Sequence, residues 1–165
     1  MIIERMLKIL MSGGLAILTG MIAYANIHDP GANLQFVKHV LSMDTVPPDS
    51  AMRDHALPVP LAWRLAFWTI VAGEGLTAAL FAVGAVELWR ARHSKARMFH
   101  EAKRCVYLGA AGGLLIWFVG FTAIGGEWYA MWQSQGWNGQ QAAFRITALI
   151  LLTVIFVGQP DCERP

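Results

Sequence analysis

Four apolar segments, each about as long as a membrane is thick, constrain this chain more than any other feature of its sequence. An α-helix needs ~20 apolar residues to cross the ~30 Å hydrocarbon core of a bilayer. The four segments span residues 6–27, 61–89, 105–124 and 141–158. The sequence therefore predicts an all-α polytopic membrane protein with a bundle of four transmembrane helices.

The overall composition agrees with a membrane protein. Hydrophobic residues make up 56% of the 165 residues and charged residues only 15%, whereas roughly a quarter of the residues in a soluble domain are charged. A larger core does not explain this deficit, because a chain this short keeps much of its surface in water. We expect a single membrane domain over residues 1–165. The net charge of +2 and the lack of a basic stripe predict no nucleic-acid partner.

The first segment also resembles a secretory signal peptide. Arg5 and Lys8 precede an apolar run that ends in Ala23-Tyr24-Ala25, which is similar to a cleavage site. The apolar core of a signal peptide is about 7–15 residues long. The run in this chain is longer, and we therefore expect a retained transmembrane helix.

Loop charge predicts which side of the membrane each loop faces. Residues 90–104 include six basic residues. The first outer loop (residues 28–60) has two basic and four acidic residues, and the second outer loop (residues 125–140) has no Lys or Arg. Because positively charged loops resist translocation, we expect the 90–104 segment in the cytoplasm. Four spans then place both termini in the cytoplasm, in agreement with Arg5 and Lys8.

Both outer loops contain signals for helix formation. In the first outer loop, Asn33 is placed to cap an amphipathic helix that continues to Leu41. We expect this short interfacial helix to lie at the outer membrane surface. In the second outer loop, Asn138 is placed to cap the fourth span, with Gln141 completing a capping box.

Glu74 is the most informative single residue, because it is an ionisable group inside a predicted span. At ~1.5 Å per residue it lies ~20 Å from Leu61, close to the middle of the membrane. Such a group is unfavourable there unless it is neutral, paired or exposed to water. A functional role would be a proton relay, a quinone or ion contact, or a polar contact to a partner helix. A structural role would be a hydrogen bond to Thr19, Thr77 or Thr122.

Three further charged residues lie near the outer ends of the spans. Arg64 lies about one turn into the second span, Arg145 lies about two turns after the Asn138 cap of the fourth, and Glu127 follows the third. We expect Arg145 and Glu127 to form an ion pair near the outer interface, with Arg64 as a competitor. Alternatively, both arginines extend to the lipid headgroups.

The sequence shows no signal for a cofactor, a metal or a common catalytic motif. All five histidines fall outside the spans or at their ends, whereas a b-type haem needs histidines on facing helices. His28, His39 and His55 share the outer side with four aspartates, but their spacing matches no metal site. Nucleotide loops, zinc helices and nucleophile elbows are absent from the sequence. We expect no catalytic residue, metal or cofactor, with a bound lipid or quinone as the one exception.

Several glycines occupy helix positions that allow neighbouring helices to approach closely. They either pack the four helices against each other or receive helices of other subunits. We expect this packing role for Gly13, Gly14, Gly20, Gly73, Gly75, Gly109 and Gly113.

Two outer-loop motifs make the chain similar to a known family. They are Phe36-Val37-Lys38-His39-Val40-Leu41-Ser42-Met43-Asp44-Thr45, and Trp132-Gln133-Ser134-Gln135-Gly136-Trp137-Asn138-Gly139-Gln140 with Phe144-Arg145. Together with the order of spans and loops, they resemble the bacterial family of predicted small integral membrane proteins of unknown function. The resemblance implies four helices in the bacterial cytoplasmic (inner) membrane, and no activity. Because both motifs lie in outer loops, we expect them to form one surface with His39, Asp44, Trp132, Gln133, Trp137, Asn138 and Gln140.

Three functions are compatible with the sequence. The one that we favour is a non-catalytic accessory subunit of a larger bacterial membrane complex, for example a respiratory one. The second is a small proton-coupled carrier or channel that uses Glu74, with the outer charged residues at its mouth. The third is a quinone- or lipid-binding component of a membrane enzyme, with its site under the Trp132–Gln140 loop. Expected partners are membrane lipids and either other membrane subunits or further copies of this chain.

Overall fold

The computed structural model describes residues 2–161, and most of this range is helical. Four helical segments are long and apolar enough to cross a membrane: Ile2–His28 (α1), Pro60–Ala91 (α3), Ala96–Trp128 and Gln140–Gly158 (α6). The third segment is made of α4 (Ala96–Glu101), α5 (Arg104–Gly113) and the π-helical stretch η2 (Leu114–Trp128). The bundle of four transmembrane helices predicted from hydropathy is therefore confirmed.

The helices extend further than the predicted spans. Helix α1 begins at Ile2 rather than at Met6, and η2 ends at Trp128 rather than at Ile124. Hydropathy marks only the apolar part of a helix, whereas backbone hydrogen bonding continues into its polar ends.

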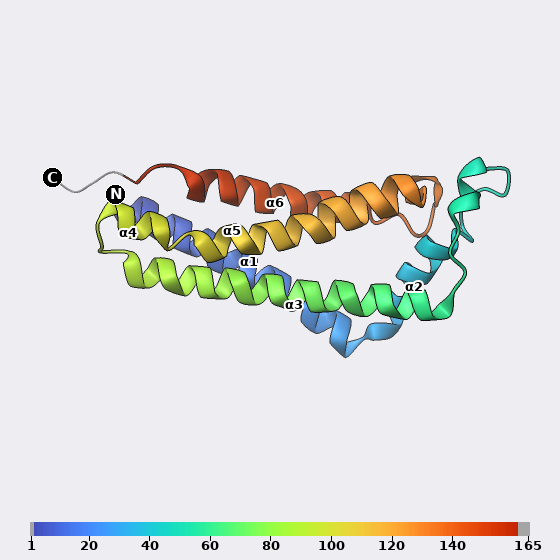
Figure 1. The fold of residues 1–165 in the computed structure, drawn as a ribbon, viewed down its shortest axis with the longest axis horizontal. Coiled ribbons are helices and arrows are strands. Elements are labelled where there is room, and N and C mark those ends of the chain that lie inside the picture. Colours follow the sequence, from blue (N-terminus) through green and yellow to red (C-terminus); the bar gives the residue numbers. More distant parts are fainter. Residues whose placement is uncertain (1, 162–165) are drawn as a thin grey trace.

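The four long segments lie side by side along the long axis of the bundle (Figure 1). The start of α1, the turn between α3 and α4, and the end of α6 lie together at one end, which we call the basic end. The opposite end, which we call the loop end, carries α2 (Pro30–Ser42) and the short 3₁₀ helices η1 (Ala51–His55) and η3 (Met131–Gln133).

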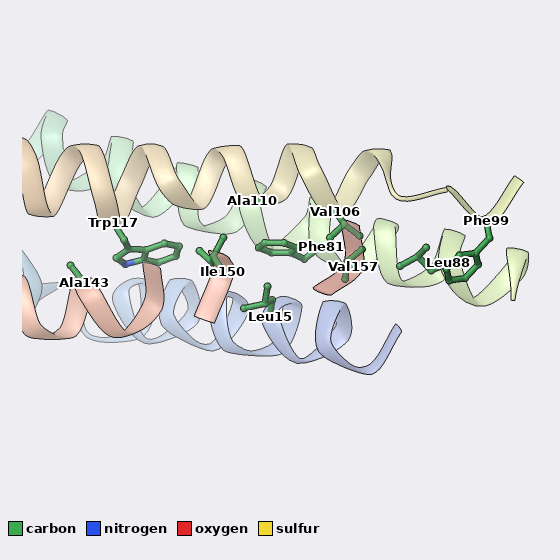
Figure 2. Close-up of a cluster of buried hydrophobic side chains, with 10 residues drawn as sticks. All are labelled: Leu15, Phe81, Leu88, Phe99, Val106, Ala110, Trp117, Ala143, Ile150 and Val157. Atoms are coloured by element: carbon green, nitrogen blue, oxygen red, sulfur yellow. The ribbon is translucent and has the colours of Figure 1, made fainter. Parts of the chain in front are cut away.

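A line of ten buried hydrophobic side chains forms the main core. Figure 2 shows them along the bundle axis, from Ala143 and Trp117 to Leu88 and Phe99. Every long helix contributes to the core, which consists of Leu15, Phe81, Leu88, Phe99, Val106, Ala110, Trp117, Ala143, Ile150 and Val157. Large apolar side chains such as Leu10 and Leu152 are exposed on the outside of the bundle, where a membrane protein contacts lipid.

Five of the seven glycines predicted to pack helices have a side chain of a neighbouring helix close to the position of a missing Cβ atom. A Cβ atom on Gly109 would lie 3.0 Å from Phe81, and one on Gly113 would lie 2.5 Å from Ile150. Gly14 and Gly75 have nothing within 4 Å, so they do not serve packing within the described part of the chain. The five that face a neighbour are Gly13, Gly20, Gly73, Gly109 and Gly113.

Helix α2 begins earlier than predicted. It begins at Pro30, with Asp29 in the N-cap position, so Asn33 lies inside the helix. Proline suits the first helical position because its missing N–H would have no helical partner there. Val37 of α2 packs against Phe67 and Val71 of α3. The apolar face of α2 therefore packs along α3, and the interfacial position expected for this helix stays a prediction.

The start of α6 agrees only partly with the predicted cap. The side chain of Asn138 accepts a hydrogen bond from the backbone N–H of Gln140 at 3.1 Å, while Gly139 occupies the N-cap position. Gln141 is exposed, and the capping box expected from it is not formed.

The π-helical segment η2 is the unexpected element of the fold. A π-helix is defined by backbone hydrogen bonds that reach five residues back, as where the Tyr129 N–H donates to the Ile124 carbonyl at 3.0 Å. The Thr122 side-chain hydroxyl also donates to a carbonyl five residues back, that of Trp117, at 3.0 Å. π-Helical turns are rare and frequently lie at functional sites. In this protein η2 faces α2 and α6 at the loop end, where the cavities described below are found.

Candidate functional site

A buried polar pair joins α1 to α3 inside the bundle. Glu74 is 2% exposed and Asn26, in the last turn of α1, is 8% exposed. The Asn26 side-chain amide donates a hydrogen bond of 2.6 Å to Glu74 Oε2. Glu74 thus has a partner, but a different one from the three threonines considered from the sequence.

Those threonines are engaged elsewhere or offer no bond to Glu74. Thr19 donates its hydroxyl to the Leu15 carbonyl of its own helix at 2.8 Å, and Thr122 donates to Trp117. Hydroxyl side chains in helices commonly bond in this way to a carbonyl of the preceding turn.

Asn26 belongs to a sequence pattern that indicates which face of α1 is buried, although the pattern does not identify Glu74 as its partner. Polar residues recur every seventh position along α1, at Arg5, Ser12, Thr19 and Asn26, and all four are buried. A seven-residue spacing keeps side chains on one face of a helix. The face of α1 that points into the bundle is therefore partly polar.

The pair lines a cavity of about 340 Å³ at the loop end. The cavity lies between α1, α2, α3, η2 and α6, and most of its wall is apolar. Asn33 is a third polar residue in this wall. The apolar wall includes Ile22, Val37, Phe67, Ile70, Trp117 and Phe121.

Two oxygen atoms of the pair remain free to accept hydrogen bonds. Within the described residues, Glu74 Oε1 and Asn26 Oδ1 have no hydrogen-bond partner. In this range, the fully buried side-chain polar atoms that lack a hydrogen-bond partner are the hydroxyls of Ser42 and Thr147. The two free oxygens of the pair are not among them, so each keeps some accessible surface. The polar end of the cavity therefore presents two unpaired acceptors.

A second cavity of about 300 Å³ lies next to the first, between α2, α3 and η2. It is almost entirely apolar, with Thr69 and Tyr129 as its polar contributors. The two cavities have four lining residues in common: Phe36, Val37, Ile70 and Phe121. The loop end therefore holds two neighbouring apolar spaces, one of which has a polar end.

The predicted outer-loop surface is formed only in part. His39 Nδ1 lies 2.8 Å and 2.9 Å from the two carboxylate oxygens of Asp44, and its ring stacks on Trp137 with centroids 4.4 Å apart. The two motifs also meet where the Thr45 and Ser134 hydroxyls form a 2.8 Å hydrogen bond.

The other residues of that predicted surface have different positions. Asn138 and Gln140 serve the start of α6, Gln133 is half-buried in η3, and Trp132 is 56% exposed. Sequence motifs located both loops correctly but did not distinguish residues that join the loops from residues that shape a helix end.

The prediction of an Arg145–Glu127 ion pair is wrong. Glu127 instead lies 3.4 Å from the side-chain amide of Gln140, while Arg145 is exposed. Arg64 is also exposed, and neither arginine forms an ion pair with the described residues. Both positions suit side chains that extend toward lipid headgroups.

The basic end contains a buried ionic cluster that sequence reasoning missed. Lys8 and Lys103 are fully buried, and both bind Asp161, whose side chain is 2% exposed. The Lys8 ammonium also contacts Glu4 at 3.0 Å and the Gln159 carbonyl at 2.9 Å. From the sequence, both lysines look like ordinary positive charges of a cytoplasmic loop or terminus. Asp161 follows the last span, and nothing in the sequence marks it as their partner.

The cluster perturbs the titration of its carboxylate. Burial alone raises the pKa of Asp161, but hydrogen bonds and charge attraction from Lys103 and Lys8 outweigh burial and hold this pKa below its ordinary value. All three donors of the Lys8 ammonium already have an acceptor. The cluster therefore holds helices together and offers little capacity to bind a ligand.

Chemically, the loop-end cavity is the stronger candidate for function. It combines a mostly apolar wall with hydrogen-bond acceptors at one end, which is the composition of most small-molecule sites. Among residues 2–161, no group of three His, Cys, Asp or Glu side chains is placed to hold a metal ion.

Comparison with known proteins adds a family but no activity. Neither a curated protein nor a solved structure matches the chain. The family described as predicted small integral membrane protein (DUF2165) matches residues 4–160, a range that covers both loops and all of the four long helices except the first two residues of α1. Because the match extends over nearly the whole sequence, the protein belongs to the DUF2165 family of predicted small integral membrane proteins.

Proposed function

We propose that this protein binds a small amphipathic molecule in the loop-end cavity, with the polar group of the ligand at Asn26 and Glu74. The observation that carries the proposal is the pair of unpaired oxygens at the end of an apolar cavity. Burying a carboxyl group in a membrane bundle is unfavourable, and such residues commonly mark functional sites. This function corresponds to the quinone- or lipid-binding alternative derived from the sequence.

The free acceptors indicate the chemistry of the ligand. Asn26 Oδ1 and Glu74 Oε1 require a group that donates hydrogen bonds, such as a hydroxyl. The apolar wall requires a ring or a short hydrocarbon chain next to that group. The volume of about 340 Å³ is at the small end of the ~300–1,000 Å³ typical of ligand pockets. A hydroquinone with a short isoprenoid chain meets all three conditions.

Titration with ubiquinol-1 and with its dimethyl ether, followed by tryptophan fluorescence, tests the proposal. Trp117 lines the cavity, so a bound ring should quench its emission. We expect saturable quenching by the quinol, and roughly 10- to 100-fold weaker binding of the ether, because the ether leaves the buried acceptors unpaired.

Protein variants locate the site in the same assay. Asn26→Leu removes the acceptor with little change in side-chain size. It should weaken quinol binding about as much as replacing the quinol by its dimethyl ether does. Ala142→Phe narrows the cavity, whereas Ala79→Phe places the same ring on an exposed position of α3 as a control. Equal binding of quinol and ether by the wild-type protein would rule out the proposed recognition.

A second candidate function is the non-catalytic accessory subunit of a larger bacterial membrane complex. It is supported by the exposed aromatic side chains of the loop end, including Trp128 and Trp132, and by Gly14 and Gly75, which have no internal neighbour. Exposed tryptophans are frequent anchors of protein interfaces. Blue-native electrophoresis in mild detergent should show co-migration with a large complex, and a stable particle that contains this chain alone would contradict this function.

The proton-coupled carrier has less support. Between Glu74 and the basic end the bundle axis is filled by core side chains that include Leu15, Phe81 and Ile150. A carrier would need a polar route through this region.

We also propose that the basic end faces the cytoplasm of a bacterium, as loop charge predicts. Gln135 at the loop end and His93 at the basic end are both exposed and suit single-cysteine labelling in a chain without its native cysteines. A membrane-impermeant maleimide added to cells with a permeabilised outer membrane should label Gln135→Cys only. Labelling of His93→Cys alone would reverse the orientation.

A further inference from the structure

A third cavity, of about 580 Å³, opens on the outside of the bundle at the basic end. It is formed by the end of α3, the turn that follows, α4 and the start of α5. It contains neither the polar pair at the loop end nor the lysine–aspartate cluster. The site is therefore independent of the proposed quinol site.

Charges of both signs line this cavity. Arg90 on α3 and Arg104 on α5 are exposed and form no ion pair with the described residues. Glu87 is half-buried and is also without an ion pair in this range. Glu101 differs from them, because it pairs with Arg97 at 3.0 Å. Cys105 also lines the cavity, and its thiol is a hydrogen-bonding neighbour of the Glu87 carboxylate. Two arginines and one glutamate therefore remain without a partner of opposite charge in this range.

Apolar surface adjoins these charges. Ala91 and Ala102 line the cavity, together with Met98 and Leu108, which are both largely exposed. The exposed ring of Trp89 lies at the same level of α3 and is typical of a residue at the membrane–water interface. A molecule in this cavity would therefore have its polar part among the charges and an apolar part along α5.

We propose that this cavity binds the headgroup of a phosphatidylethanolamine lipid, with its phosphate at Arg90 and Arg104 and its ammonium at Glu87. Guanidinium groups match phosphate oxygens in geometry and charge. The primary ammonium supplies N–H donors for the Glu87 carboxylate, which a choline headgroup lacks. A phosphatidylglycerol headgroup satisfies the arginines but brings no cation to Glu87.

Native mass spectrometry with competing lipids tests this assignment. The purified full-length protein is mixed with equimolar phosphatidylethanolamine, phosphatidylcholine and phosphatidylglycerol that have identical acyl chains. We expect one tightly retained phosphatidylethanolamine, bound about fivefold more strongly than either competitor. Preference for phosphatidylglycerol, or no preference, would overturn the assignment.

Matched variants separate the site from general attraction to basic residues. Arg90→Gln and Arg104→Gln should each weaken phosphatidylethanolamine binding several-fold. Lys95→Gln is the control, because it removes one positive charge from the turn between α3 and α4, and Lys95 does not line the cavity. Glu87→Gln should abolish the preference for ethanolamine over glycerol while phosphate binding continues. An equal effect of Lys95→Gln and Arg104→Gln, or an unchanged preference in Glu87→Gln, would contradict the proposal. Melting temperatures of all variants show whether each one is folded.

Discussion

Replacing Asp161 by alanine is expected to lower the free energy of unfolding by about 3–5 kcal/mol, the usual effect of removing one partner from a buried ion pair. Lys8 and Lys103 are fully buried, and Asp161 is a shared partner of both ammonium groups. Without this carboxylate, two positive charges face each other in the same buried space. Unfolding in detergent, followed by circular dichroism, measures the change.

A matched control for this substitution exists at the same end of the molecule. Glu101 pairs with Arg97, but both side chains are largely exposed, so Glu101→Ala should cost at most about 1 kcal/mol. Combining Lys8→Met, Lys103→Met and Asp161→Leu removes the charges together and should restore much of the stability. A loss in Asp161→Ala no larger than in Glu101→Ala would contradict a stabilising role for the cluster.

The same cluster predicts a dependence of stability on pH. The pKa of Asp161 in the folded protein lies below its ordinary value of 3.8, so its carboxylate stabilises the fold above that pH. This contribution should disappear as the pH falls from about 4 through the folded-state pKa. Unfolding curves between pH 7 and pH 3 should therefore converge for the wild-type protein and Asp161→Asn as the pH decreases, and a constant difference would argue against the shifted pKa.

Replacing Gly84 by leucine is expected to destabilise the bundle by about 3 kcal/mol, at the upper end of the usual effect of overpacking. Even a single Cβ atom on Gly84 would lie 2.6 Å from Val106 Cγ2 and 2.8 Å from the Val106 backbone nitrogen. Because a backbone atom is involved, a side-chain rotation cannot relieve the clash, and α3 and α5 must separate.

Gly75 provides the control on the same helix. It is exposed, and a Cβ atom there would meet nothing within 4 Å. Gly75→Leu should therefore leave the melting temperature in detergent unchanged or slightly raised, since leucine favours a helix over glycine. Equal destabilisation by both substitutions would show that α3 and α5 do not meet at Gly84.

The parts of the fold that depend on local composition could be predicted from the sequence. Four apolar runs of sufficient length predicted the four helices, because a bilayer imposes the same length on each one. The start of α2 was misplaced, since Asn33 looked like a cap while Pro30 occupies the first helical position. The π-helical form of η2 was not predicted, because its apolar sequence is equally compatible with an ordinary α-helix.

The sites required distances that a sequence does not contain. Glu74 was identified because an ionisable residue is conspicuous inside an apolar run. Its partner Asn26 was missed, since the pairing depends on how α1 and α3 are aligned along their axes. Lys8 and Asp161 are separated by almost the whole chain, and only the folded bundle brings them together.

Native mass spectrometry of the protein extracted from its own membranes tests the central claim, that the loop-end cavity holds an amphipathic molecule, most directly. We expect the wild-type protein to carry a bound molecule that is smaller than a phospholipid and contains a hydroxyl group. The same molecule should be lost from Asn26→Leu and retained by Ala79→Phe. A wild-type protein that carries phospholipid alone, or a small molecule retained equally by Asn26→Leu, would contradict the claim.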